Sequence, residues 1–400
     1  MRMSALQQQI SLRLAQIAGA LSDDALPESD PALYIGNMGE VLFLMYYSRY
    51  TGEDRWYDLA GARLEQIFEQ IENQQTYEGA FGPGLGGTFF AIEHLVKQDF
   101  IDESARDSLT MFDDFFVKFM HLRLQKNDFD YFSGATGIGS YLLERLPFQP
   151  ALSDALEQLL TVFEQDAQPD GAGGFFWKTT FSRPDGASEI NISLTHGMLS
   201  QVLLLARLCK AGVAPARCRT LLEGAVSFLL RQEQDAAQYY SLFPNVAGFP
   251  TTSRLGWCYG DLGIALGLYR AGQACEHPDW IEKAMDIFQY TTTRRDLQRN
   301  MVKDAAFCHG ACGIAQFFQR MYLETGIPAF ENTHQYWTQQ VLNLARPGAG
   351  IAGYLPHIAM EHIPPANTRS LLNGVSGIGL SLICADSDIP PDWDACFLLS

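Results

Sequence analysis

Gly36-Asn-Met-Gly39 precedes the apolar stretch EVLFLMYY (residues 40–47), and this pairing of a short glycine motif with an apolar stretch recurs along the chain. Successive first glycines are separated by 48, 50, 63, 63, 50 and 64 residues. The motifs are Gly36–Gly39, Gly84–Gly87, Gly134–Gly137, Gly197–Ser200, Gly260–Gly263, Gly310–Gly313 and Gly374–Gly377, of which the fourth ends in serine. Recurrence at this spacing is typical of a repeat architecture.

The segments between the glycine motifs have the periodicity of amphipathic helices. In residues 53–73, one apolar stripe consists of Trp56, Ala60, Leu64, Ile67 and Ile71. Comparable segments lie near residues 4–21, 104–123, 151–165, 216–231, 278–293 and 331–346. Each repeat is therefore predicted to be an amphipathic helix, a glycine turn and a second, more apolar helix.

Seven such pairs predict an all-α fold of about fourteen helices, because an apolar helix is buried and an amphipathic one covers it. We expect a closed α/α toroid, a double ring of about seven inner and seven outer helices, formed by residues 1–400 as a single domain. An open α-solenoid of the same pairs is the alternative. In the toroid, the glycine motifs place seven helix N-termini, with their free N–H groups, at one end of the ring, where we expect the site.

Composition narrows the class of protein. The 400 residues are 47% apolar and 12% aromatic, as in globular proteins. The net charge is −18 and no basic run is interleaved with aromatic residues, which argues against a nucleic-acid partner. The sequence contains no apolar run of about 18 residues, so no membrane span is predicted. The eight cysteines, from Cys209 onward, follow no apolar export signal, so we expect reduced thiols and a cytoplasmic location.

Two of the glycine motifs carry possible metal ligands. Cys258 lies in SRLGWCYGDLG (residues 253–263), and Cys308 and His309 lie in AFCHGACG (residues 306–313). These are equivalent places in adjacent repeats, which the fold would bring side by side. Two Cys and one His suit Zn²⁺, and three protein ligands leave a fourth position open, as in catalytic sites.

Two alternatives remain for these residues. Buried Cys and His residues often serve only in packing. Cys308 and Cys312 also lie four residues apart and could form a ligand pair on one helical face. Cys312 fills a variable position of its glycine motif, which favours a packing role for it.

Together, GWCYGDLG (residues 256–263), CHGACG (residues 308–313) and SLTHG (residues 193–197) on seven glycine repeats resemble the lanthionine synthetase C-like family, the cyclases of lantibiotic-type peptide biosynthesis. The resemblance covers essentially the whole chain. It implies a double α-toroid with one Zn²⁺ bound by Cys258, Cys308 and His309. It also implies Michael-type addition of peptide Cys thiols to dehydroalanine or dehydrobutyrine, which forms (methyl)lanthionine thioether rings. The substrate would be a dehydrated precursor peptide, with a separate dehydratase as a possible partner.

The implied chemistry needs a thiolate and a proton donor. A thiol of pKa near 8.5 is mostly protonated at neutral pH, and coordination to Zn²⁺ removes its proton. Addition to the β-carbon leaves an enolate, which must be protonated at the α-carbon by a group of near-neutral pKa. His196 matches the functional histidine of the family and is the predicted acid/base.

Three further residues resemble functional positions of the family. Asp130 could orient or charge a histidine, Arg254 could support the enolate charge, and Tyr259 offers a phenol beside the metal. Loop hydrogen bonds, a surface ion pair and ring packing are the alternative roles for the three. Asp261 is interpreted as a helix N-terminal carboxylate. The polar loop of residues 166–194 is a candidate to overhang the site.

Other functions are compatible with parts of the pattern. A non-catalytic, zinc-containing peptide- or thiol-binding protein of the same fold is the main alternative. Prenyltransferase subunits also use zinc to activate a thiolate, but the ligand set of two Cys and one His in this motif frame argues against them. Glycosidases would need a pair of carboxylates at the helix starts, and the sequence offers none there.

Overall fold

The computed structural model describes residues 4–22, 30–73, 78–179, 189–357 and 369–400. The chain divides into two compact units. Unit 1 comprises residues 1–78, 83–100 and 301–400, so it is built from both ends of the chain. Unit 2 comprises residues 79–82 and 101–300. Each unit is largely helical.

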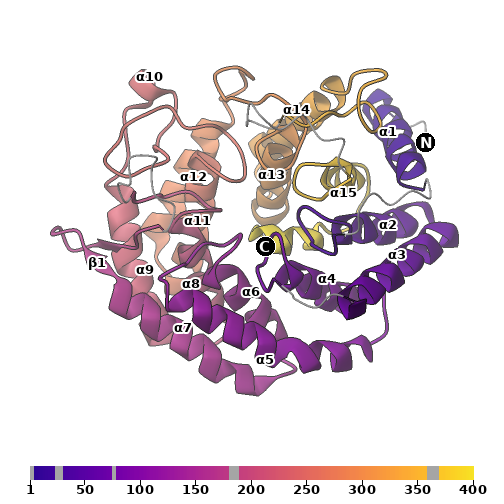
Figure 1. Cartoon of the computed structure of the whole chain (residues 1–400). Helices are drawn as coiled ribbons and strands as arrows, with labels where there is room; N and C mark the ends of the chain where they lie inside the picture. The colour runs from indigo at the N-terminus through magenta and orange to yellow at the C-terminus, as the bar shows by residue number, and fades with distance from the viewer. Residues whose placement is uncertain (1–3, 23–29, 74–77, 180–188, 358–368) are drawn as a thin grey trace. The chain divides into compact units, whose positions relative to one another are not determined.

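The described residues of unit 1 form α-helices and one short 3₁₀ helix. These are α1 (Ala5–Leu21), α2 (Met38–Thr51), α3 (Asp54–Asn73), α4 (Leu85–Lys97), α13 (Ala311–Thr325), α14 (Pro328–Asn343), α15 (Val375–Asp386) and η2 (Asp392–Phe397). Helix α1 packs against α14 and α15, and α13 packs against the same two helices (Figure 1). The first and last repeats of the sequence are therefore neighbours within this unit.

In unit 2, the described residues form the middle helices and one hairpin. These are α5 (Ala105–Leu124), α6 (Ala135–Arg145), η1 (Pro150–Leu152), α7 (Ser153–Asp166), β1 (Gln168–Pro169), β2 (Phe175–Phe176), α8 (Leu199–Lys210), α9 (Pro215–Leu230), α10 (Ala236–Tyr239), α11 (Asp261–Cys275) and α12 (Pro278–Thr291). Helix α11 packs against α12 and α8, and α8 packs against α9. Consecutive repeats thus lie side by side, as the order in Figure 1 shows.

The helices that begin at the glycine motifs are buried nearly all round, as predicted. Helix α4 buries every residue from Leu85 to Val96, and α11 every residue from Asp261 to Gly272. Close packing at the start of such a helix requires glycine. In α6, for example, a Cβ on Gly137 would lie 2.2 Å from the carbonyl oxygen of Tyr131. The motifs therefore mark inner helices.

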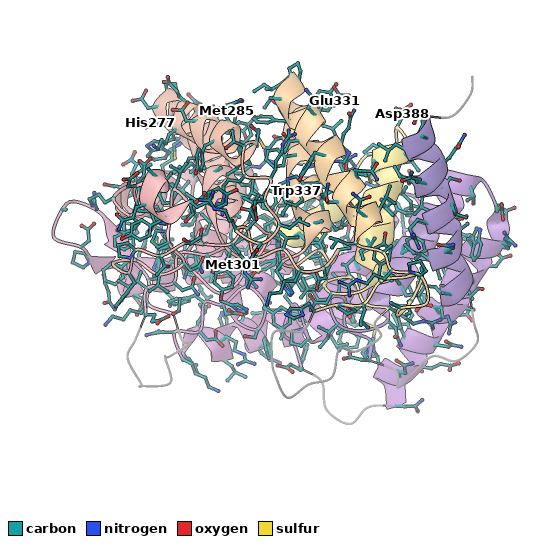
Figure 2. All side chains as sticks on the ribbon, turned by 90° about the horizontal axis from the view of Figure 1, so that it is seen from above. His277, Met285, Met301, Glu331, Trp337 and Asp388 are labelled. Carbon is teal, nitrogen blue, oxygen red and sulfur yellow. The ribbon has the colours of Figure 1, made fainter. Side chains whose placement is uncertain are left out.

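The predicted amphipathic helices bury one stripe each. In α3 the buried residues are Trp56, Ala60, Arg63, Leu64, Ile67 and Ile71, which is the predicted stripe with one arginine added. In α14, Trp337 is fully buried, whereas Glu331, in the first turn of the helix, is only half-buried (Figure 2). This helix begins at Pro328, ahead of the predicted start at residue 331, because proline favours the first turn of a helix.

Within unit 2, backbone hydrogen bonds join the loops of successive glycine motifs. Gly82 N donates to Phe132 O (2.7 Å), Tyr131 N to Thr195 O (3.2 Å) and Thr195 N to Cys258 O (3.4 Å). These bonds place corresponding positions of the repeats next to one another at the helix starts, as the repeat pattern predicts.

Unit 1 has the same kind of ladder between its own loops. Cys308 N donates to Leu372 O (3.1 Å), and Leu372 N donates to Tyr34 O (2.9 Å). The loop of the seventh motif is thereby joined on one side to the sixth and on the other to the first.

The polar loop after α7 forms the only sheet among the described residues. Strands β1 and β2 pair antiparallel, and the Trp177 that follows them is buried, with its indole N–H donating to Phe163 O at 2.9 Å. Residues 180–188 of the predicted overhanging loop lie outside the described residues. Among the helices that are described, none has the length and apolar character needed to cross a membrane.

Candidate active site

The loop that carries Cys308 and His309 is fixed by the carboxyl group of Asp304. Asp304 Oδ1 accepts from Ala306 N (3.0 Å), and the backbone carbonyl oxygen of Asp304 accepts from Ala311 N (3.1 Å). These two hydrogen bonds close the turn around Gly310. Asp304 Oδ2 accepts from the backbone N–H of His357 at 2.6 Å. The cysteine and histidine therefore sit on a turn and not on a regular helix, as their convergence requires.

The tautomer of His309 follows from one contact. Its Nε2 lies 3.3 Å from the backbone carbonyl oxygen of His357. A carbonyl can only accept, so Nε2 carries the proton and donates it. In the neutral ring Nδ1 then holds the lone pair, which is the form a metal ligand needs.

Cys258 lies on the loop before α11, in unit 2. It is 5% exposed, and its carbonyl oxygen accepts the bond from Thr195 N, the residue before His196. Arg254 and Tyr259 are half-buried on the same loop. Their predicted catalytic roles stay predictions.

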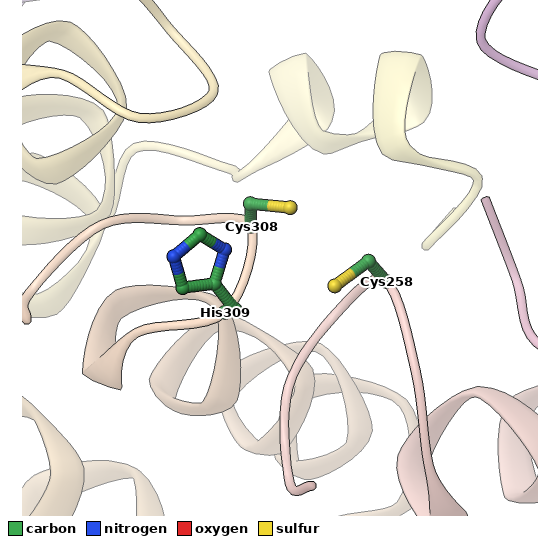
Figure 3. Close-up of side chains that lie close together, drawn as sticks. All are labelled: Cys258, Cys308 and His309. Atoms are coloured by element: carbon green, nitrogen blue, oxygen red, sulfur yellow. The ribbon is translucent and has the colours of Figure 1, made fainter. Parts of the chain in front are cut away.

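Cys258, Cys308 and His309 are grouped in the structure. Each offers one ligand atom, a sulfur or a ring nitrogen, and these atoms lie within 4.8 Å of one another (Figure 3). Two thiol sulfurs and an imidazole nitrogen are donors that suit Zn²⁺. The donor set and its spacing fit a single metal ion.

Cys312 has the properties of a packing residue. It is fully buried in α13, and its thiol points to the carbonyl oxygen of Gly377 at 3.4 Å. Burial raises the pKa of this thiol to about 12, so it stays protonated. The alternative ligand pair of Cys308 and Cys312 is therefore disfavoured.

His196 and Asp130, 66 residues apart in sequence, form a hydrogen-bonded pair in unit 2. The distance from His196 Nδ1 to Asp130 Oδ2 is 2.6 Å. The other carboxylate oxygen of Asp130 accepts from the backbone N–H and the hydroxyl of Ser133, at 2.6 and 3.0 Å. A carboxylate held in this way fixes the orientation of the imidazole and leaves Nε2 as its outer nitrogen.

The surroundings of His196 raise its pKa. Burial alone would lower the pKa, but the hydrogen bond and the negative charge of Asp130, with a smaller contribution from Cys258, outweigh it. The imidazole therefore holds a proton to higher pH than an ordinary histidine does, which suits a general acid.

Sequence reasoning missed Arg294, which lies beside the Cys258 loop. Asp261 is the first residue of α11, as predicted, but it is fully buried and forms an ion pair with Arg294 at 2.7 Å. It also accepts from Leu242 N and Phe243 N. Arg294 has no motif around it, so no local signal pointed to it.

A recurring cap was also missed, although the sequence contains its signal. An acidic or amide residue lies six positions before the first glycine of several motifs, and its side chain accepts the N–H two residues further on. The residues are Asp30, Asp128, Asn191 and Asp304. Counting back from each glycine would have found it.

Comparison with known proteins places the chain in a family. Residues 27–398 match the model of the lanthionine synthetase C-like proteins, so the chain belongs to that family. It is similar to nisin biosynthesis protein NisC of Lactococcus lactis subsp. lactis, with 22% identity over 306 residues that cover 70% of this chain and 71% of NisC.

Among solved structures, the chain is similar to nisin cyclase. The TM-score is 0.78 at 17% identity, over 98% of this chain and 97% of that chain. The likeness shows a shared fold, and it confirms the predicted fold class, an all-helical α/α toroid. The family resemblance inferred from the motifs is confirmed as well.

Proposed function

We propose that this protein is a zinc-dependent lanthionine cyclase. Its reaction would join Cys thiols to dehydroalanine or dehydrobutyrine residues within a dehydrated precursor peptide. Membership of the family and similarity to NisC support the class of reaction. The grouping of two cysteines and a histidine within 4.8 Å is the observation that carries the proposal, because the reaction needs an activated thiol.

We assign Cys258, Cys308 and His309 as the ligands of one Zn²⁺. Two anionic sulfurs and a neutral imidazole suit this ion, and three ligands leave a position for the substrate sulfur. When bound, the ion would lower the pKa of a substrate thiol and so maintain it as the thiolate. His309 is prepared for this role by the hydrogen bond from Nε2 to His357 O.

His196 is proposed to handle the proton. Addition of the substrate thiolate forms a C–S bond at the β-carbon and moves the electrons of the carbon–carbon double bond into an enolate. The α-carbon must then gain one proton, and His196 Nε2 is the proposed donor. Asp130 holds the opposite nitrogen at 2.6 Å and raises the pKa of the ring, which favours the protonated form of the donor.

Arg254 and Tyr259 are proposed to support the enolate. They share the loop of Cys258, so they would lie near the reacting carbons if the sulfur is bound there. A guanidinium supplies a fixed positive charge, and a phenol supplies a hydrogen-bond donor. We further propose a cytoplasmic location and a separate dehydratase that prepares the peptide.

A cyclisation assay tests the proposal. The protein is incubated with a dehydrated precursor peptide, and unreacted thiols are alkylated before mass analysis, because cyclisation itself changes no mass. Native protein is expected to remove the alkylatable thiols, whereas Cys258→Ala and His309→Ala lose Zn²⁺ and this activity. Cys275→Ala, at a half-buried cysteine outside the group, is the matched control.

Two outcomes would overturn the assignment. If Cys258→Ala and His309→Ala cyclise as fast as the native protein, the metal group does not carry the reaction. Zinc-dependent binding of the precursor with no thioether formed would identify a non-catalytic peptide-binding protein instead.

A further inference from the structure

The loop of residues 253–260 lacks the cap that other glycine motifs use. In those motifs an Asp or Asn six positions before the glycine accepts a backbone N–H, at 2.9 Å for Asp30 and 3.0 Å for Asp304. The corresponding residue before Gly260 is Arg254. A guanidinium has no acceptor, so this loop must be held in another way.

Arg294 supplies the missing hold from outside the loop. Its side chain is fully buried and donates in three directions. Nη2 donates to Ser253 O at 2.8 Å, Nη1 to Asp261 at 2.7 Å, and Nε to Asn300 Oδ1 at 3.0 Å. Because a guanidinium is rigid and planar, these three bonds fix the start and the end of the loop relative to each other.

Asn300 completes the hold on the other side of Arg254. Its side-chain amide donates to the backbone carbonyl oxygen of Arg294 at 2.8 Å, and the backbone carbonyl oxygen of Asn300 accepts from Leu255 N at 3.2 Å. The backbone on both sides of Arg254, at Ser253 and Leu255, is thus bound by the same buried pair.

We infer that Arg294, together with Asp261 and Asn300, positions the loop that presents Cys258. Because these residues replace the usual cap, position 254 can be occupied by a cationic side chain, that of Arg254, and not by a capping Asp or Asn. Arg294 and its partners are positioning residues, because they act on Cys258 through the loop. A loop already fixed in its metal-binding conformation loses less conformational freedom when the ion binds. The inference rests on the proposed role of Cys258 as a zinc ligand.

The substitution Arg294→Lys separates positioning from charge. A lysine can keep the ion pair with Asp261, but its single ammonium group cannot also reach Ser253 O and Asn300. We expect the affinity for Zn²⁺ to fall by about 10- to 100-fold, the range found for residues that orient metal ligands. Affinity is measured by competition with a chromogenic chelator, and Co²⁺ substitution reports the thiolate-to-metal absorption.

Arg145→Lys is the matched control within the same unit. Arg145, the last residue of α6, is also fully buried, and it binds Asp113 at 3.2 Å and Thr110 at 3.0 Å, both on α5. The Arg145→Lys variant should lower the thermal midpoint to a similar extent as Arg294→Lys, but leave the Zn²⁺ affinity within twofold of native. If Arg294→Lys fails to fold, Asn300→Ala removes the two hydrogen bonds between the Asn300 side chain and Arg294 and keeps the ion pair with Asp261.

The outcomes distinguish this inference from the proposed function. Equal Zn²⁺ affinity in Arg294→Lys (or Asn300→Ala, where that variant replaces it) and Arg145→Lys overturns the positioning role. A native protein that binds Zn²⁺ through Cys258 but forms no thioether overturns the cyclase proposal alone. A native protein that binds no Zn²⁺ overturns both.

Discussion

At the scale of single residues, the pair formed by His196 and Asp130 carries the acid–base part of the proposal. The two residues come from different motifs, and each was a candidate for its own reason. The contact of 2.6 Å makes the two residues a functional pair, because the carboxylate both orients the ring of His196 and raises its pKa.

Asp130→Asn tests this pair through the pH dependence of cyclisation. Asp130 raises the pKa of His196, so its removal should lower that pKa and deprotonate the donor at lower pH. The alkaline limb of the rate profile should therefore move to lower pH, with a reduced maximum. Measurement of cyclisation rates across pH checks this, with His196→Asn as the variant without a titrating donor. An alkaline limb that stays in place would contradict the role of Asp130.

At the scale of elements, the glycine motifs fix where the inner helices begin. Gly260 precedes α11 with φ +97° and lies against the backbone of the Cys258 loop. A Cβ there would lie 1.9 Å from the carbonyl oxygen of Arg254, so any side chain must displace the loop. The start of this helix and the placement of Cys258 are therefore linked.

Gly260→Ala should combine backbone strain with this displacement. With φ +97° and ψ −169°, Gly260 lies in a region of backbone dihedral angles that is essentially confined to glycine, and an L-residue there costs about 1–3 kcal/mol. Gly326→Ala is the control: with φ +67° and ψ +12° at the end of α13 it lies in the left-handed helical region, which also strains an L-residue, but its Cβ would meet nothing within 4 Å. We expect both variants to lose stability in urea unfolding, and only Gly260→Ala to lose Zn²⁺ affinity. Equal Zn²⁺ affinities in the two variants would show that the loop tolerates the displacement.

At the scale of the whole molecule, unit 1 depends on the C-terminal residues of the chain. The ring of Phe397 in η2 stacks on Phe307 at 3.8 Å and on Tyr34 at 4.9 Å between ring centroids. Phe307 directly precedes Cys308. Residues near both ends of the sequence thus support the loop that carries two of the proposed zinc ligands.

Phe397→Ala should destabilise the protein by about 3–5 kcal/mol, because it removes a fully buried aromatic ring from the core. Chemical unfolding measures this loss. Leu323→Ala is the control: its side chain is 56% exposed, and we expect a change within about 0.5 kcal/mol. A Phe397→Ala variant as stable as the control would show that η2 is dispensable for unit 1.

The amino-acid sequence alone predicts the repeat, the places where buried helices begin and the residue types of the candidate site. These features are local: a glycine turn, an apolar period and a Cys-His pair are all legible within a few residues. Which residues contact one another, such as His196 with Asp130 and Arg294 with Ser253 O, is visible only in the folded chain. Local periodicity cannot specify such contacts, because the packing of helices distant in sequence brings their side chains together.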